Sequence, residues 1–163
     1  RKETIMNEII LSRVDSRLIH GQVMTMWSKT GGINHIYVVD DQVASDPFMK
    51  DVYLMAVPDS LGVTIHSVDD AVSQYKNGQM PDAKLLVLIK DVTTAYRLWK
   101  QRFPMESLQI GNLTPQKKTK ILHRSSRLSE EHMPELLEMR REGVMVYAQS
   151  VPTEKKIDVE TWA

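Results

Sequence analysis

The fold of this chain is decided by residues 9–27, which read IILSRVDSRLIHGQVMTMW. The segment begins with an apolar run typical of a buried strand and ends with apolar residues at helical spacing. Asp15, Arg17, His20 and Gly21 lie in the loop between this strand and this helix. In open α/β sheets, ligands bind beyond the carboxyl ends of the strands, and the first turn of a helix there attracts anions. We therefore expect the functional site in this loop.

The residue types in the loop suit the transfer of a phosphoryl group, which needs positioning and charge stabilisation. His20 is the one side chain there that is both nucleophilic and able to titrate near neutrality. Asp15 could hold one ring nitrogen of His20 and present the other for attack on phosphorus. Arg17 could stabilise the phosphate charge through its planar guanidinium. Gly21 tolerates unusual dihedrals and lets the backbone approach a phosphate closely, and Gln22 adds a neutral hydrogen-bond donor.

The same residues also allow structural interpretations. A single histidine between a strand and a helix is more often a capping or packing residue than a catalyst. Asp15 and Arg17 could simply form a surface ion pair, which contributes little to stability, and Gln22 could just begin the helix. From composition and spacing alone, the loop is therefore a candidate anion or phosphate site.

Residues 13–23, RVDSRLIHGQV, resemble the active-site signature of the IIB proteins of the mannose–fructose–sorbose family. These proteins belong to the bacterial phosphoenolpyruvate-dependent sugar phosphotransferase system. The resemblance implies that His20 is transiently phosphorylated on Nδ1, with Asp15 orienting the ring and Arg17 stabilising the phosphate. Ser16 stands where the family often has a second acidic residue. The likeness continues in residues 38–47 and 143–152, and so runs through most of residues 6–155.

By this resemblance, the chain accepts a phosphoryl group from a phosphohistidine of a partner IIA domain. It then passes the group to a sugar bound by the membrane IIC/IID complex, which makes it a phosphohistidine–sugar phosphotransferase. Because donor and acceptor must both reach His20, we expect a shallow, exposed site. Two other classes are a non-catalytic module that binds an anionic ligand in the same crevice and a histidine-dependent phosphatase or mutase. The phosphatase fits less well, because Ile19 rather than an arginine precedes His20 and no second catalytic histidine is evident.

Further polar residues follow two other predicted strands. Asp40 and Asp41 come after the apolar run 35–39, and Lys90 and Asp91 follow the run 84–89. Since the carboxyl ends of parallel strands meet at one edge of a sheet, Asp40 and Lys90 could line the same crevice as His20. Asp40 and Asp41 are explained more simply as residues of the turn into the next helix, and Lys90 could pair with Asp91.

Strands and helices alternate along the sequence, which predicts a single α/β domain over residues 1–163 with a doubly wound, mainly parallel sheet and helices on both faces. The resemblance adds that the sheet has about seven strands. Residues 1–5 fit the pattern poorly and could be upstream residues. The predicted strands cover 9–11, 35–39, 63–66, 84–89, 107–110 and 144–148, with a charged edge strand within 117–127 and no regular structure after 152. The predicted helices cover 23–27, 47–56 (apolar face Phe48, Val52, Met55 and Ala56), 68–75, 92–103 and 129–141.

The composition argues against several classes of protein. Lys plus Arg equals Asp plus Glu, at 21 each, so no net charge attracts nucleic acid or anionic lipid. Residues 117–127 hold five Lys or Arg and no acid. Without interleaved aromatic residues, this stretch is better explained as a solvated edge strand, or as a surface for an acidic partner protein, than as a nucleic-acid patch.

The chain has no cysteine, so it can neither form disulfides nor carry a phosphoryl group on a thiol, as several other IIB classes do. Its five histidines lack metal-ligand spacing, and it has no Walker-type or dinucleotide-binding glycine loop. We therefore expect neither a metal nor a cofactor. The longest clean apolar run, residues 85–89, is far shorter than the roughly 20 residues of a membrane helix, and no signal peptide is visible. We expect a cytoplasmic protein, which the resemblance places beside the membrane transporter as a peripheral component.

Overall fold

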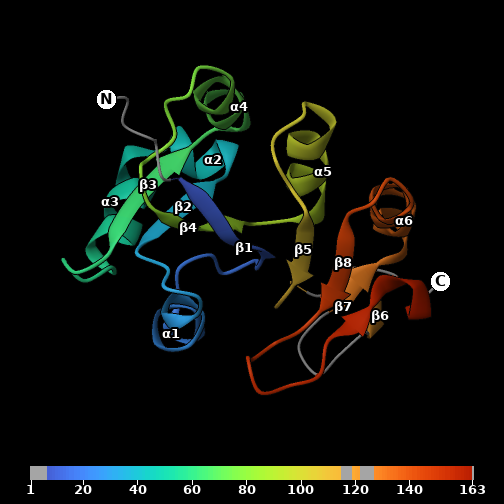
Figure 1. The fold of residues 1–163 in the computed structure, drawn as a ribbon. Coiled ribbons are helices and arrows are strands. Elements are labelled where there is room, and N and C mark those ends of the chain that lie inside the picture. The colour runs from blue at the N-terminus through green and yellow to red at the C-terminus, as the bar shows by residue number, and fades with distance from the viewer. Residues whose placement is uncertain (1–6, 115–118, 122–126, 163) are drawn as a thin grey trace, which may run out of the picture.

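A computed structural model describes residues 7–114, 119–121 and 127–162. Its centre is a seven-stranded sheet with the strand order β3-β2-β4-β1-β5-β8-β9 (Figure 1). Neighbouring strands are parallel except β8 and β9. The strands are β1 (Glu8–Val14), β2 (His35–Val39), β3 (Gly62–His66), β4 (Lys84–Ile89), β5 (Ser107–Ile110), β8 (Met145–Ala148) and β9 (Ile157–Asp158). The fold is therefore a single α/β domain with a mainly parallel sheet, as predicted.

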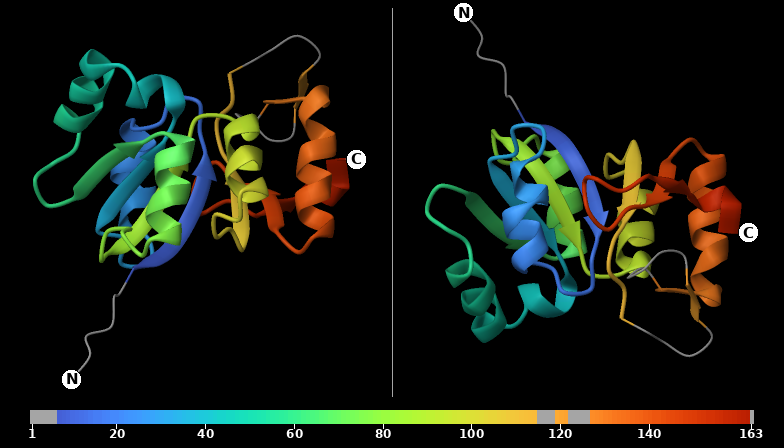
Figure 2. Two further views of the ribbon diagram at one scale, coloured as in Figure 1. Left: turned by 90° about the horizontal axis from the view of Figure 1, so that it is seen from above. Right: turned by 90° about the horizontal axis from the view of Figure 1, so that it is seen from below.

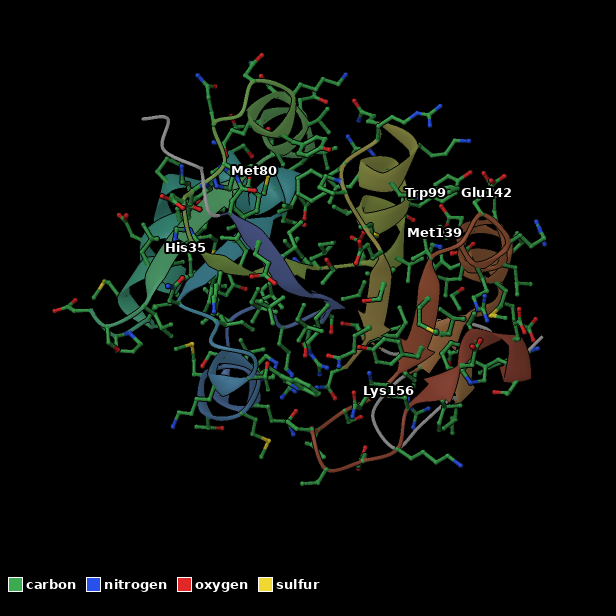
Figure 3. All side chains as sticks on the ribbon, in the orientation of Figure 1. His35, Met80, Trp99, Met139, Glu142 and Lys156 are labelled. Carbon is green, nitrogen blue, oxygen red and sulfur yellow. The ribbon has the colours of Figure 1, made fainter. Side chains whose placement is uncertain are left out.

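Helices cover both faces of the sheet (Figure 2). One core cluster joins the sheet to α4, α5 and α6, and the other joins it to α1 and the α2–α3 segment. Trp99 on α5 and Met139 on α6, labelled in Figure 3, belong to the first of these layers. The helices are α1 (Gly21–Thr25), α2 (Asp41–Ala44), α3 (Pro47–Met55), α4 (Val68–Lys76), α5 (Val92–Lys100) and α6 (Met133–Arg141), with short 3-10 turns η1 (Trp27–Lys29), η2 (Glu130–His132) and η3 (Val159–Trp162). The doubly wound prediction is confirmed.

The connections that leave β1 and β4 go to opposite faces of the sheet. β1 leads to α1, which packs in one core cluster, whereas its neighbour β4 leads to α5, which packs in the other. Such a point, where the winding direction reverses, opens a crevice beyond the carboxyl ends of the two strands. The loop 15–20 lies at this switch point.

β4 lies inside the sheet, paired with β1 on one side and β2 on the other. All of residues 85–89 are fully buried. A continuous run of Leu, Val and Ile suits a strand that helices cover on both faces.

The seventh strand is not the one that the sequence suggested. Regular structure continues past residue 152, and β9 pairs antiparallel with β8 at the edge of the sheet. A strand of two residues, Ile157 and Asp158, is too short to show any periodicity in the sequence. Within the basic stretch, the described residues form β6 (Thr119–Ile121) and β7 (Arg127–Ser129), an antiparallel pair separate from the main sheet. The rest of that stretch lies outside the described residues.

The apolar stripe predicted for residues 47–56 faces outward. Phe48 is 73% exposed and Met55 is 85% exposed, and α3 has no fully buried residue. The side chains that pack α3 against the core are instead Met49 and Tyr53. These lie on the neighbouring face of the helix, one position further along from Phe48 and Val52. Two adjacent apolar faces made the buried side of this helix ambiguous in the sequence.

Candidate functional site

The loop after β1 is fixed to the neighbouring strands on both sides. The backbone N–H of Asp15 donates to the carbonyl of Ile89 at 2.8 Å, and the N–H of Ser16 donates to the carbonyl of Asn112 at 2.8 Å. The loop then turns back on itself, because the N–H of Leu18 donates to the carbonyl of Asp15. Leu18 has a φ of 55°, which is uncommon for a branched residue, and its side chain is fully buried. Packing therefore holds the turn that brings His20 back toward Asp15.

Asp15 and His20 form the central pair of the site. Oδ2 of Asp15 lies 2.9 Å from Nε2 of His20, and the Asp15 side chain is fully buried. The other ring nitrogen, Nδ1 of His20, is buried and has no hydrogen-bond partner among the described residues. A carboxylate accepts hydrogen bonds and does not donate them, so it favours the tautomer with the proton on Nε2. The lone pair of Nδ1 is then left unused.

Asp15 remains ionised in spite of its burial. Burial raises the pKa of this carboxyl, but the hydrogen bond from His20 and the charge of Arg13 lower it by more, so the pKa falls below its ordinary value. The main chain contributes as well, since the N–H of Arg17 donates to Oδ1 at 3.1 Å.

Arg17 lies beside this pair but is half exposed. Its Nε is 3.8 Å from Oδ1 of Asp15, and its Nη2 donates to Oε1 of Gln22 at 3.4 Å. The side chain of Arg17 is 51% exposed. The ion pair with Asp15 considered from the sequence is present but long, and it leaves most of the guanidinium accessible to a ligand.

Asn112 and Arg13 complete the site and were not singled out from the sequence. Nδ2 of Asn112 lies within 3.3 Å of both Oδ2 of Asp15 and Oε1 of Gln22. Asn112 follows β5, the other neighbour of β1, so the rule that predicted Lys90 could also have found it. Arg13 contacts Asp15 from inside the sheet at 3.2 Å. Its role could not be found from a strand pattern, because a charged residue there normally indicates an exposed position.

His20 is less exposed than predicted. It is the N-cap residue of α1, and only 12% of its side chain is accessible. The expectation of a shallow, exposed site is therefore not met at this ring, because the buried Asp15 draws the ring toward the sheet. Gly21 has no left-handed φ, but the space where a Cβ would project is open to at least 4 Å.

The other predicted crevice residues divide into two groups. Asp40 is buried and accepts from the N–H of Val43 at 3.0 Å, so it caps α2, and Asp41 binds Val68 N–H and Arg97. Both behave as turn and capping residues. Lys90 forms no ion pair with Asp91 among the described residues, and Asp91 caps α5 instead. Lys90 lines a hollow of about 150 Å³ together with Ser16, at the same edge of the sheet as His20.

Two features are absent from the described part of the chain. Among the described residues, no three His, Asp or Glu side chains are placed to share a metal ion. None of the helices described here combines the length and apolar composition that crossing a bilayer requires.

The sequence model of the "PTS system sorbose subfamily IIB component" matches residues 9–162. The chain belongs to this family. A sorbose-specific EIIB component from Lacticaseibacillus casei is 33% identical over 152 residues, which cover 93% of this chain and 92% of that protein. The crystal structure of manxB from Thermoanaerobacter tengcongensis superposes with a TM-score of 0.88 at 35% identity, covering 97% of this chain and 96% of that chain. The IIBSor domain of the sorbose permease from Klebsiella pneumoniae superposes with a TM-score of 0.85 at 27% identity, with 93% of both chains covered.

Membership of this family makes the chain a IIB phosphoryl carrier of a sugar phosphotransferase system. A IIB component works between a IIA donor and a membrane IIC/IID complex, so the family also implies these partners. The recognition made from residues 13–23 is confirmed.

Proposed function

We propose that His20 carries the phosphoryl group of this IIB component, on Nδ1. The observation that carries the proposal is the pairing of Nε2 with the buried carboxylate of Asp15 at 2.9 Å, while Nδ1 has no hydrogen-bond partner in the part of the chain that the structure describes. The Nδ1 lone pair attacks phosphorus, and the bond from phosphorus to the IIA histidine breaks, returning its electron pair to that ring. A sugar hydroxyl oxygen then attacks phosphorus and gives up its proton to solvent, and the Nδ1–P bond breaks with its electron pair returning to the His20 ring.

The other residues of the loop supply orientation and charge. Asp15 holds the ring and its tautomer, as the carboxylate partner of a reacting histidine does in other enzymes. Arg17 reaches the phosphoryl oxygens with its accessible guanidinium, where it stabilises the charge in transit. Gly21 leaves space for the phosphoryl group, and Gln22, which receives hydrogen bonds from Arg17 and Asn112, keeps Arg17 in place.

Transfer requires a local movement at His20. Nδ1 is buried in the structure, so a donor histidine cannot approach it in line unless the groups that cover Nδ1 move aside. Lys90 lies at the same edge of the sheet, and we propose that it attracts the phosphorylated donor without touching the transferred group.

The test is intact mass spectrometry after incubation with phosphoenolpyruvate, enzyme I, the phosphocarrier HPr and a cognate IIA. We expect an acid-labile gain of one phosphoryl group, lost in His20→Ala. His132→Ala is a matched control, because His132 also pairs with a carboxylate, Glu135, at 2.8 Å. A phosphoryl group retained in His20→Ala would refute the proposal. No gain in the wild type with demonstrably phosphorylated IIA would favour an anion-binding module.

A further inference from the structure

Arg13 carries a fully buried charge, and nothing in the transfer step proposed above uses it. It lies near the end of β1, opposite Gln109 of β5 and Leu88 of β4, and its side chain is fully buried. Burial lowers the pKa of this guanidinium, and the charge of Asp15 opposes that effect. Removing a cation from water is unfavourable unless it is well paired, so such a residue needs compensating contacts.

The hydrogen bonds of Arg13 fix its orientation from three directions. Nη2 and Nε point toward Oδ2 of Asp15, at 3.2 and 3.4 Å. Nη1 donates to the side-chain oxygen of Gln109 and to the carbonyl of Gln149, and Nη2 also donates to the carbonyl of Ser150. These partners come from β5 and from the segment after β8, which are far apart in the sequence. Both ends of the planar fork are therefore held.

The remaining surface of the guanidinium is enclosed by packing. The centroid of the Trp27 ring lies 4.9 Å from Cζ of Arg13, and the indole N–H of Trp27 donates to the same Ser150 carbonyl at 3.1 Å. Gly111 approaches so closely that a Cβ at this position would overlap the guanidinium. Here glycine is needed for space, because any side chain would displace Arg13.

We propose that Arg13 is a positioning residue for phosphoryl transfer, acting on His20 only through the Asp15 carboxylate. This inference rests on the proposed role of His20. Oδ2 of Asp15 is shared by Arg13 and Nε2 of His20, so the guanidinium determines where that oxygen lies and keeps it charged. Arg13 cannot touch a phosphoryl group, because its side chain has no accessible surface. The two arginines of the motif thus have different roles. The buried Arg13 orients His20 through Asp15, and the half-exposed Arg17 contacts the phosphoryl group.

The segment after β8 takes part in the same arrangement. Gln149 accepts from Gln109 through its side chain at 3.1 Å and donates to the carbonyl of Glu154 at 2.7 Å. Its own carbonyl holds Arg13. Residues 149–154 therefore help to hold Arg13 in place, although they lie more than a hundred positions after His20 in the sequence.

A double-mutant cycle tests the proposal with Arg13→Gln, Asp15→Asn and the double variant, each measured for its rate of phosphorylation by phospho-IIA. We expect Arg13→Gln to slow the transfer by roughly ten- to a hundredfold, as when a partner that orients a histidine is removed. In the Asp15→Asn background, the same change should have no further effect. Arg13→Lys should recover part of the rate, since it keeps the charge but loses the planar fork. Arg140→Gln is the control, because it removes an arginine that pairs with another carboxylate, Asp158.

The ¹⁵N spectrum of the unphosphorylated His20 ring gives a readout that does not depend on transfer. We expect the Nε2–H tautomer in the wild type and a mixture in Arg13→Gln. If Arg13→Gln does not fold, Gln109→Met removes one acceptor of Arg13 at similar volume and should slow transfer severalfold, again only when Asp15 is present. An unchanged rate, or equal losses with and without Asp15, would overturn the role of Arg13. A wild type that is not phosphorylated on His20 would instead refute the proposed function.

Discussion

At the scale of single residues, the side chains of the site differ in how deeply they are buried. Asp15 and Arg13 are fully buried, His20 is nearly covered, and Arg17 is half exposed. Charges inside the sheet are held in one geometry, so they can orient His20 without rearranging during the reaction. The charge that must meet a ligand is left on a side chain that can move. The reactive residues of the loop were predictable from the sequence, but this division was not, because burial depends on the neighbouring strands.

The first prediction concerns Arg17. Replacing it by Gln removes a charge-assisted hydrogen bond of about 1.5–3 kcal/mol to the phosphoryl group, which corresponds to a roughly ten- to hundredfold slower transfer. Folding should be unaffected, because half of the side chain is exposed and its ion pair with Asp15 is long. Rapid-quench kinetics with phospho-IIA measure the rate, and Arg17→Lys should lie between the two. A rate equal to that of the wild type would show that Arg17 does not contact the phosphoryl group.

At the scale of elements, the helix beginnings follow the sequence closely, whereas the buried face of α3 does not. Asp46, Ser67 and Asp91 each cap the helix that follows, through a hydrogen bond that depends on residues only two or three positions away. Which face of α3 is buried, and whether β9 forms at all, depend on contacts with residues far away in the sequence. Local chemistry therefore determines where an element starts, whereas its orientation is decided by what the rest of the chain offers for packing.

A second prediction concerns the cap of α3. The carboxylate of Asp46 accepts from the N–H groups of Phe48 and Met49, at 3.1 and 3.2 Å. Asp46→Ala leaves both donors without this acceptor and should reduce the free energy of unfolding by about 1 kcal/mol, whereas Asp46→Asn should cost much less. Urea unfolding measures the difference. Equal losses in both variants would contradict the capping account, and phosphorylation of His20 should be normal in both.

At the scale of the whole molecule, the sheet brings together site residues from three strands and from the segment after β8. The site could be placed at the carboxyl ends of the strands from the alternating pattern alone, and the resemblance of residues 13–23 supplied the residues of the loop. Gln109, Gln149 and Ser150 could not be found in this way, since their part in the site comes from the pairing of β1 with β5 and of β5 with β8. Contacts across a sheet are specified by the register, which a single sequence shows poorly.

The pH dependence of stability is also a property of the whole molecule. Burial lowers the pKa of His66 below its ordinary value of 6.5, although the hydrogen bond to Asp70 opposes this, and burial lowers that of His35. The unfolded chain therefore binds more protons than the folded one. The stabilising contribution of these two histidines is fully present above pH 6.5 and is lost as the pH falls through their folded pKa values. The depressed pKa of Asp15 has the same sign and acts below its ordinary value of 3.8.

We therefore expect the free energy of unfolding in urea to be lower at pH 5.5 than at pH 7.5. His66→Phe should reduce this difference, because it removes one of the two histidines whose buried neutral form is protonated on unfolding. A free energy that stays constant or rises as the pH is lowered would contradict the account.

The central claim, that Asp15 holds Nε2 and leaves Nδ1 of His20 to carry the phosphoryl group, is tested most directly by NMR of the phosphorylated protein. In a sample with ¹⁵N-labelled histidine, the coupling between phosphorus and nitrogen identifies the modified ring and the modified atom. We predict a single phosphohistidine, His20, with phosphorus bound to Nδ1 and a proton retained on Nε2. Phosphorus bound to Nε2, or to another histidine, would contradict the account.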